Sequence, residues 1–112
     1  MVRRERLAHQ WAAGRLGVRC LPLELVNPRF YHLDTCFCPV APGEAIYFPD
    51  AFDTYGRRVL HTHVPKLIPV AEPEAHRFGC NAVVVGKTVV HNSRCPGLAA
   101  DLQTAGYRSI EV

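Results

Sequence analysis

Apolar residues recur along the chain in short runs that predict alternating helices and strands. Leucine and tryptophan at near-helical spacing, followed by a glycine stop, predict an amphipathic helix over residues 3–16. Residues 18–25 and 30–40 carry the aromatic, branched and leucine-rich runs that are typical of strands. The beginning of the chain therefore predicts one helix followed by two strands.

The rest of the chain predicts a second set of strands and helices. Its clearest signal is a hairpin over residues 81–92, where two runs of branched residues flank Gly86-Lys87. The other predicted elements are a turn at Pro42-Gly43, a strand over 44–48, a helix over 50–60 capped by Asp50, a strand over 67–70, a helical turn over 73–78, a helix over 96–105 and a strand over 107–112. Two consecutive units emerge, each with a strand pair, a helix and a returning strand, which indicates an α/β fold.

Reactive side chains concentrate in the stretch FYHLDTCFCPV, residues 30–40. If this stretch is a strand, His32, Asp34 and two cysteines share one face, because successive side chains point to opposite sides. The Cα atoms of His32 and Asp34 are then about 6.6 Å apart, a spacing that lets both side chains hold one small polar ligand. The alternative is a solvent-facing strand edge with small cysteines as buried filler.

Composition narrows the classes of protein that the chain fits. Its 112 residues, 48% hydrophobic and 21% charged, predict a single folded domain over 1–112. Lys and Arg are dispersed apart from a cluster in the first six residues, so we expect no nucleic-acid groove, and Glu5 disfavours a transit peptide. No apolar run approaches the roughly 20 residues that span a bilayer. Five cysteines without a secretory signal favour reduced thiols and a cytoplasmic location.

Five stretches in order carry a resemblance to a known family. They are Leu21-Pro-Leu-Glu-Leu25, residues 30–39, Cys80-Asn-Ala-Val-Val-Val-Gly86, Cys95-Pro96 and Gly106-Tyr107. Together they resemble the C-terminal half of the amidinotransferase and dimethylarginine dimethylaminohydrolase family, over nearly the whole chain. The resemblance implies a partial pentein fold: an α/β propeller of five strand and helix modules, of which this chain supplies about two and is truncated at both ends.

The resemblance also implies a chemistry for the stretch over 30–40. In this family a cysteine thiolate attacks the central carbon of a guanidinium, a histidine protonates the departing amine, and water or an acceptor amine releases the thiouronium intermediate. His32 would be the general acid and base, and Asp34 would hold the guanidinium nitrogens. Histidine titrates near pH 6.5 and carboxylate oxygens match the guanidinium fork, so both residue types suit these tasks. A small-molecule guanidine is the expected partner, and no cofactor is expected.

The nucleophile is expected to lie outside this chain. In family members the reactive cysteine follows a glycine-rich stretch just beyond the strand that here is 107–112. Cys36 and Cys38 would lie on the same strand as the base, where they are poorly placed to aim at a substrate lying over it. Of the three remaining cysteines only Cys95 is a candidate, because a position before a helix can lower a thiol pKa. The chain is therefore expected to be catalytically silent alone and to self-associate or require the missing half of the enzyme.

Two other kinds of function remain open from the sequence. One is a binding module that uses His32 and Asp34 to hold a guanidine or amine without turnover. The other is a zinc-stabilised interaction domain, in which Cys36-x-Cys38 and His61-x-His63 would supply four ligands. Paired zinc cysteines are usually separated by two to four residues, so we expect no metal site. His76 and His91 are interpreted as surface or hairpin residues. Asn81 is interpreted as a turn cap, and the resemblance also allows it a place near the substrate. Hydrolase and amidinotransferase chemistry, and the identity of the guanidine, also stay open.

Overall fold

A computed structural model describes residues 15, 17, 23–30 and 32–112. The predicted helix over 3–16 and most of the predicted strand over 18–25 lie outside these residues. Of that strand, Leu25 forms an isolated antiparallel bridge with Phe52. Among the described residues, no helix is long and apolar enough to cross a bilayer.

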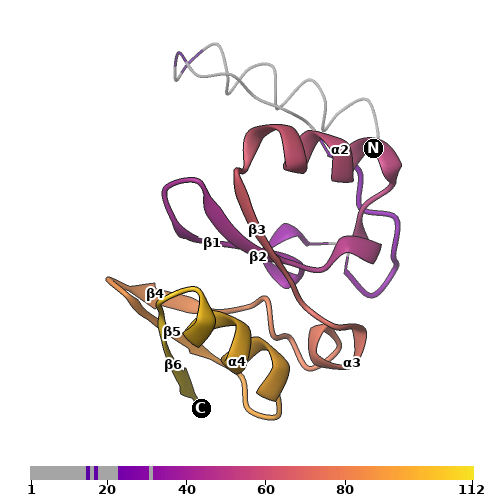
Figure 1. The fold of residues 1–112 in the computed structure, drawn as a ribbon. Coiled ribbons are helices and arrows are strands. Elements are labelled where there is room, and N and C mark those ends of the chain that lie inside the picture. The colour runs from indigo at the N-terminus through magenta and orange to yellow at the C-terminus, as the bar shows by residue number, and fades with distance from the viewer. Residues whose placement is uncertain (1–14, 16, 18–22, 31) are drawn as a thin grey trace.

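The two predicted units are both present and have the same topology (Figure 1). In the first, β1 (Phe37–Ala41) pairs antiparallel with β2 (Glu44–Tyr47), and β3 (Lys66–Pro69) returns parallel to β2 after helix α2 (Thr54–His63). In the second, β4 (Val83–Val85) pairs antiparallel with β5 (Thr88–His91), and β6 (Arg108–Glu111) returns parallel to β5 after helix α4 (Pro96–Thr104). The short helix α3 (Glu72–Ala75) links the units. Each unit is therefore a ββαβ module.

Glycine forms both hairpin turns, as the sequence predicts. Gly43 follows Pro42 with a φ of 73°, and Gly86 has a φ of 59°. Both values lie in the left-handed region that residues with a Cβ avoid. The positions of the hairpin turns are thus decided by local backbone chemistry.

Two predicted boundaries are wrong, for local reasons. Residues 30–40 do not form one strand: a 3-10 turn, η1 (Leu33–Thr35), precedes β1. Asp50 does not cap the first long helix, because it lies in a separate 3-10 turn, η2 (Pro49–Ala51). Asp53 is the cap instead, and its Oδ1 accepts the Gly56 amide at 2.7 Å.

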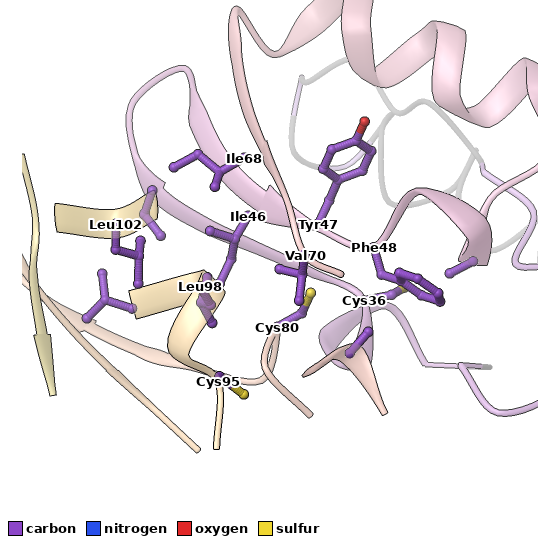
Figure 2. Packing of buried hydrophobic residues seen from close by; sticks show 14 of the residues in the cluster. Cys36, Ile46, Tyr47, Phe48, Ile68, Val70, Cys80, Cys95, Leu98 and Leu102 are labelled. Carbon is purple, nitrogen blue, oxygen red and sulfur yellow. The ribbon is translucent and has the colours of Figure 1, made fainter. Parts of the chain in front are cut away.

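One apolar core joins the two units (Figure 2). Ile46 and Ile68 of the first sheet lie beside Leu98 and Leu102 of α4, which also packs on β6 of its own sheet. Helix α4 is therefore shared between the two sheets. The remaining buried members of the core come from both units and from the link between them: Phe30, Cys36, Val40, Tyr47, Phe48, Ala51, Phe52, Leu60, Val70, Ala75, Cys80, Val89, Cys95 and Tyr107.

Candidate functional site

His32 and Asp34 lie on an exposed turn at the entrance to β1, not on a strand face. His32 is the residue before η1, with extended backbone angles, and its carbonyl accepts both the amide and the hydroxyl of Thr35. Asp34 is the second residue of the turn. Both side chains are exposed. The turn presents an imidazole and a carboxylate to solvent two residues apart.

The prediction that His32, Asp34, Cys36 and Cys38 share one face is wrong. His32 and Asp34 are exposed, whereas Cys36 is completely buried. The cause is η1, whose turn breaks the alternation that a strand would impose. The strand β1 begins only at Phe37.

Asp34 opens onto a surface pocket of about 280 Å³ at the junction of the two units. The first unit contributes Asp34 and residues 37–39, and the second contributes residues 80–82. The half-buried Phe37 and the exposed Asn81 are among the lining residues. Carboxylate, aromatic and amide residues around one pocket are residue types that can bind a small planar cation.

Asn81 lines the pocket with Asp34, a place that its residue pattern alone does not predict. Its backbone amide donates to the Phe78 carbonyl at 3.0 Å, which accounts for a local turn, and it also lines the pocket with Asp34. No spacing rule connects residues this far apart in sequence. The connection is made by the packing of one unit against the other, where the Cys38 thiol lies 3.6 Å from the Ala82 carbonyl.

The described cysteines have the properties of structural thiols. Cys36, Cys80 and Cys95 are each fully buried. Burial raises the pKa of Cys36 to about 11, against a smaller lowering by Thr35, and burial also raises the pKa of Cys38, Cys80 and Cys95. For Cys95 this direction is opposite to the lowering that a helix start can produce. A raised pKa reduces the thiolate fraction, which is the nucleophilic form.

Two polar residues, Glu74 and His91, are buried, which the sequence does not predict for either of them. Glu74 is 8% exposed, and its carboxylate accepts the amides of Gly97 and Leu98 at 2.9 and 2.8 Å at the start of α4. His91 lies on hairpin strand β5 but is buried, with ring nitrogens bonded to the Asn92 carbonyl and the Ser109 hydroxyl. The interpretation of His91 as a surface or hairpin residue is therefore correct only for its place in the hairpin.

The four residues considered for zinc do not form a metal site. His61 and His63 are exposed on α2, and His61 Nε2 lies 3.3 Å from the Tyr47 hydroxyl. Cys36 is buried in the core and Cys38 lies against Ala82. Within the part of the chain that the structure describes, no three His, Cys, Asp or Glu side chains are grouped so that they could hold a metal ion.

Known proteins are similar to this chain in sequence and in fold. No family model matches the chain. The chain is 41% identical over 106 residues to the bifunctional arginine dihydrolase/ornithine cyclodeaminase AgrE of Nostoc sp., covering 93% of this chain and 15% of AgrE. It is 39% identical over 110 residues to the dimethylarginine dimethylaminohydrolase of Mycobacterium tuberculosis, covering 98% of this chain and 36% of that protein.

A solved structure is similar over the same extent. The N-terminal domain of ArgZ, a cyanobacterial arginine dihydrolase, was captured as a cysteine-to-serine variant bound to substrate. It superposes with a TM-score of 0.89 at 40% identity, covering 94% of this chain and 40% of that one. The chain thus spans well under half the length of these proteins.

The repeated ββαβ modules define the class: the chain has an α/β fold of the pentein type, with two modules present. Its relatives identify the family. The chain belongs to the amidinotransferase and dimethylarginine dimethylaminohydrolase family, whose members here are arginine and dimethylarginine hydrolases.

Proposed function

We propose that this chain supplies the acid-base and guanidinium-binding part of a guanidino-group hydrolase or amidinotransferase. The observation that carries the proposal is the Asp34 pocket, in a chain about 40% identical to arginine and dimethylarginine hydrolases. The substrate would be arginine or a methylated arginine. Hydrolysis would give citrulline and an amine, whereas transfer would pass the amidino group to an acceptor amine.

His32 is proposed as the general acid and base. A cysteine thiolate adds to the guanidinium carbon, and the carbon–nitrogen bond to the departing amine breaks as His32 gives that amine a proton. In the second step the oxygen of a water molecule attacks the thiouronium carbon, and His32 accepts a proton from that water. The cysteine thiolate then leaves, which gives the urea product. His32 is exposed and directly precedes the turn that carries Asp34. This position is compatible with both proton transfers.

Asp34 is proposed to hold the guanidinium before and during attack. A carboxylate accepts two parallel N–H bonds from a planar guanidinium, which fixes the plane of the carbon that the nucleophile must approach. Phe37 and Asn81 would complete the cradle, the ring through a cation–π contact and the amide through a hydrogen bond.

The nucleophile is proposed to come from outside these 112 residues. Burial raises the pKa of each described cysteine, Cys95 included, so none has the thiolate character of an attacking group. The ArgZ domain that binds substrate as a cysteine-to-serine variant supports a cysteine as the nucleophile of the family. The thiols of this chain, free in the described part, also support the proposed cytoplasmic location.

Binding and turnover are tested separately. Arginine and dimethylarginine are titrated into the 112-residue chain by calorimetry, and Asp34→Asn should weaken binding at least tenfold, whereas Asp101→Asn, on the exposed surface of α4, should not. Citrulline and amine release are then measured with this chain and with a version extended in both directions. Turnover only by the extended protein, abolished by His32→Ala but not by His63→Ala, is the expected result.

Three outcomes would count against the proposal. Turnover by the 112-residue chain itself would mean that one of its own cysteines is the nucleophile. Equal binding by the Asp34→Asn and Asp101→Asn variants would remove Asp34 from the site. Binding without turnover by the extended protein would favour the non-catalytic binding module.

A further inference from the structure

A second surface pocket, of about 330 Å³, takes no part in the proposed guanidine chemistry. Its described lining residues are Arg29 and Phe30, which precede η1, and His76 and Phe78, which follow α3. None of them lines the pocket beside Asp34. The volume falls within the range of about 300–1,000 Å³ that is usual for small-molecule sites. We call this pocket the Arg29 pocket.

Most of the described residues that line the Arg29 pocket are aromatic. The Phe30 and His76 rings lie 5.3 Å apart, and the buried Phe48 ring lies 4.9 Å from Phe30 and 6.3 Å from His76. His76 Nε2 also lies 3.5 Å from the Glu72 carboxylate, and Phe78 is 49% exposed. Aromatic side chains favour an aromatic ligand, because rings pack against one another in stacked or edge-to-face arrangements.

Phe78 has a backbone conformation that costs stability. Its φ is 58°, in the left-handed region that is strained for a bulky residue. Its carbonyl accepts the Asn81 amide at 3.0 Å and the Asn92 side-chain amide at 3.2 Å, which hold the conformation. Because half of the side chain is exposed, burial in the core does not offset the strain. Strain that the surrounding structure maintains is a feature of ligand sites, so contact with a ligand gives this residue a use.

Arg29 determines the charge of the ligand that the pocket can take. It is exposed, and a guanidinium can form two parallel hydrogen bonds with a carboxylate. The nearby Glu72 is not among the lining residues, and its carboxylate is paired with His76. A guanidinium group would be repelled by Arg29, whereas Asp34 attracts it in the other pocket. The two pockets therefore select groups of opposite charge.

We propose that the Arg29 pocket binds a small aromatic carboxylate. The carboxylate pairs with Arg29, and the ring packs against Phe30 and Phe78. An exposed arginine alone gains little from an anion, and a neutral ring gains nothing from the arginine, so both parts of the ligand are needed. Benzoate is the simplest member of this class and is the probe for the test.

Binding is measured by NMR titration of the isotope-labelled 112-residue chain. Benzoate should bind at least fivefold more tightly than benzamide, which has the ring without the charge, and than acetate, which has the charge without the ring. Arg29→Gln should weaken benzoate binding at least fivefold, whereas Arg58→Gln, at an exposed arginine on α2, should not. Equal affinity for benzoate and benzamide, or no saturable binding of benzoate, would overturn the proposal.

A second variant, Phe78→Asn, separates ligand contact from stability. Asparagine tolerates the left-handed conformation, so the unfolding equilibrium constant should not rise, while benzoate affinity should fall at least fivefold. Arg94→Asn is the matched control, because Arg94 has a φ of 64° but does not line the pocket. It should leave benzoate affinity unchanged. A Phe78→Asn variant that loses stability but binds benzoate normally would make Phe78 a structural residue and would overturn the proposal.

Arginine and the Asp34→Asn variant distinguish this pocket from the proposed guanidine site. Asp34→Asn should leave benzoate affinity unchanged, and saturating arginine should not displace benzoate, because the two pockets share no lining residue. Both results are independent of whether the chain binds or turns over a guanidine. Displacement of benzoate by arginine would place both ligands in one site, which contradicts a separate carboxylate pocket.

Discussion

Glu74 holds the start of α4 and so fixes one unit against the other. It is the last but one residue of α3, and its two carboxylate oxygens accept the Leu98 and Gly97 amides at 2.8 and 2.9 Å. These amides are among the donors that the first turn of a helix leaves without partners, and the positive end of the helix dipole favours a carboxylate there. Replacing Glu74 by alanine should therefore be much more destabilising than an ordinary surface substitution.

The size of the loss follows from the surroundings of the two amides. The Leu98 amide is buried, so leaving it without a partner costs about 1–3 kcal/mol. The Gly97 amide can be reached by water because Gly97 is exposed, so its loss is nearer ~1 kcal/mol. The total is about 2–4 kcal/mol, which corresponds to a fall in Tm of roughly 10 °C or more in a domain of this size.

Urea unfolding followed by circular dichroism measures this loss, with Glu72→Ala as the matched control. Glu72 lies on the same short helix, is exposed and pairs with His76 at 3.5 Å, so its removal should cost less than about 1 kcal/mol. Glu74→Gln keeps one acceptor oxygen and should fall between the two. If Glu74→Ala is no more destabilising than Glu72→Ala, the capping bonds do not hold α4 and the reasoning is wrong.

Three further substitutions test other features of the fold. Gly86→Ala should destabilise by about 1–2 kcal/mol in urea unfolding because of the positive φ, whereas Gly86→Asn should cost clearly less, since asparagine tolerates that conformation. Ser109→Ala should lower the free energy of unfolding by about 1–3 kcal/mol, because it leaves a buried His91 nitrogen without its partner; an unchanged free energy of unfolding would show that water replaces the hydroxyl. The raised pKa of Cys36, about 11 against an ordinary value of 9.0, means that the neutral thiol stabilises the fold fully below pH 9 and that this contribution disappears as the pH rises to 11. The wild type should therefore lose about 2 kcal/mol more than Cys36→Ala between pH 9 and pH 11, and parallel stability curves would contradict this.

The fold was predictable where local chemistry decides it. Two runs of branched residues around Gly86 predict the second hairpin, and Pro96 with Gly106 brackets α4 to within one residue. The twofold repeat of strand pair, helix and returning strand follows from the same signals, and both units are present. The start of α2 was not predicted, because Asp50 and Asp53 are both acceptable caps in sequence and only the Gly56 amide distinguishes them.

The backbone that carries the two candidate residues is not predicted correctly. Residue type and the family resemblance select His32 and Asp34 as candidates, but a strand is the wrong setting for them. The aromatic and branched residues around them do favour a strand, and the opposing signal is Thr35, whose hydroxyl and amide both bond the His32 carbonyl and close a turn. A hydrogen bond three residues back outweighed propensity over this short stretch.

The pocket beside Asp34 depends on the junction between the units, because one wall comes from β1 and the other from residues 80–82. The junction is held by packing of α4 on both sheets, and α4 is held at its start by Glu74. Loosening that cap would let the wall that carries Asn81 move relative to Asp34, although Glu74 itself does not line the pocket. We therefore expect Glu74→Ala to weaken arginine binding, at temperatures where the chain is still folded, by more than Glu72→Ala does. Unchanged affinity would mean that the pocket is organised by β1 and its preceding turn alone.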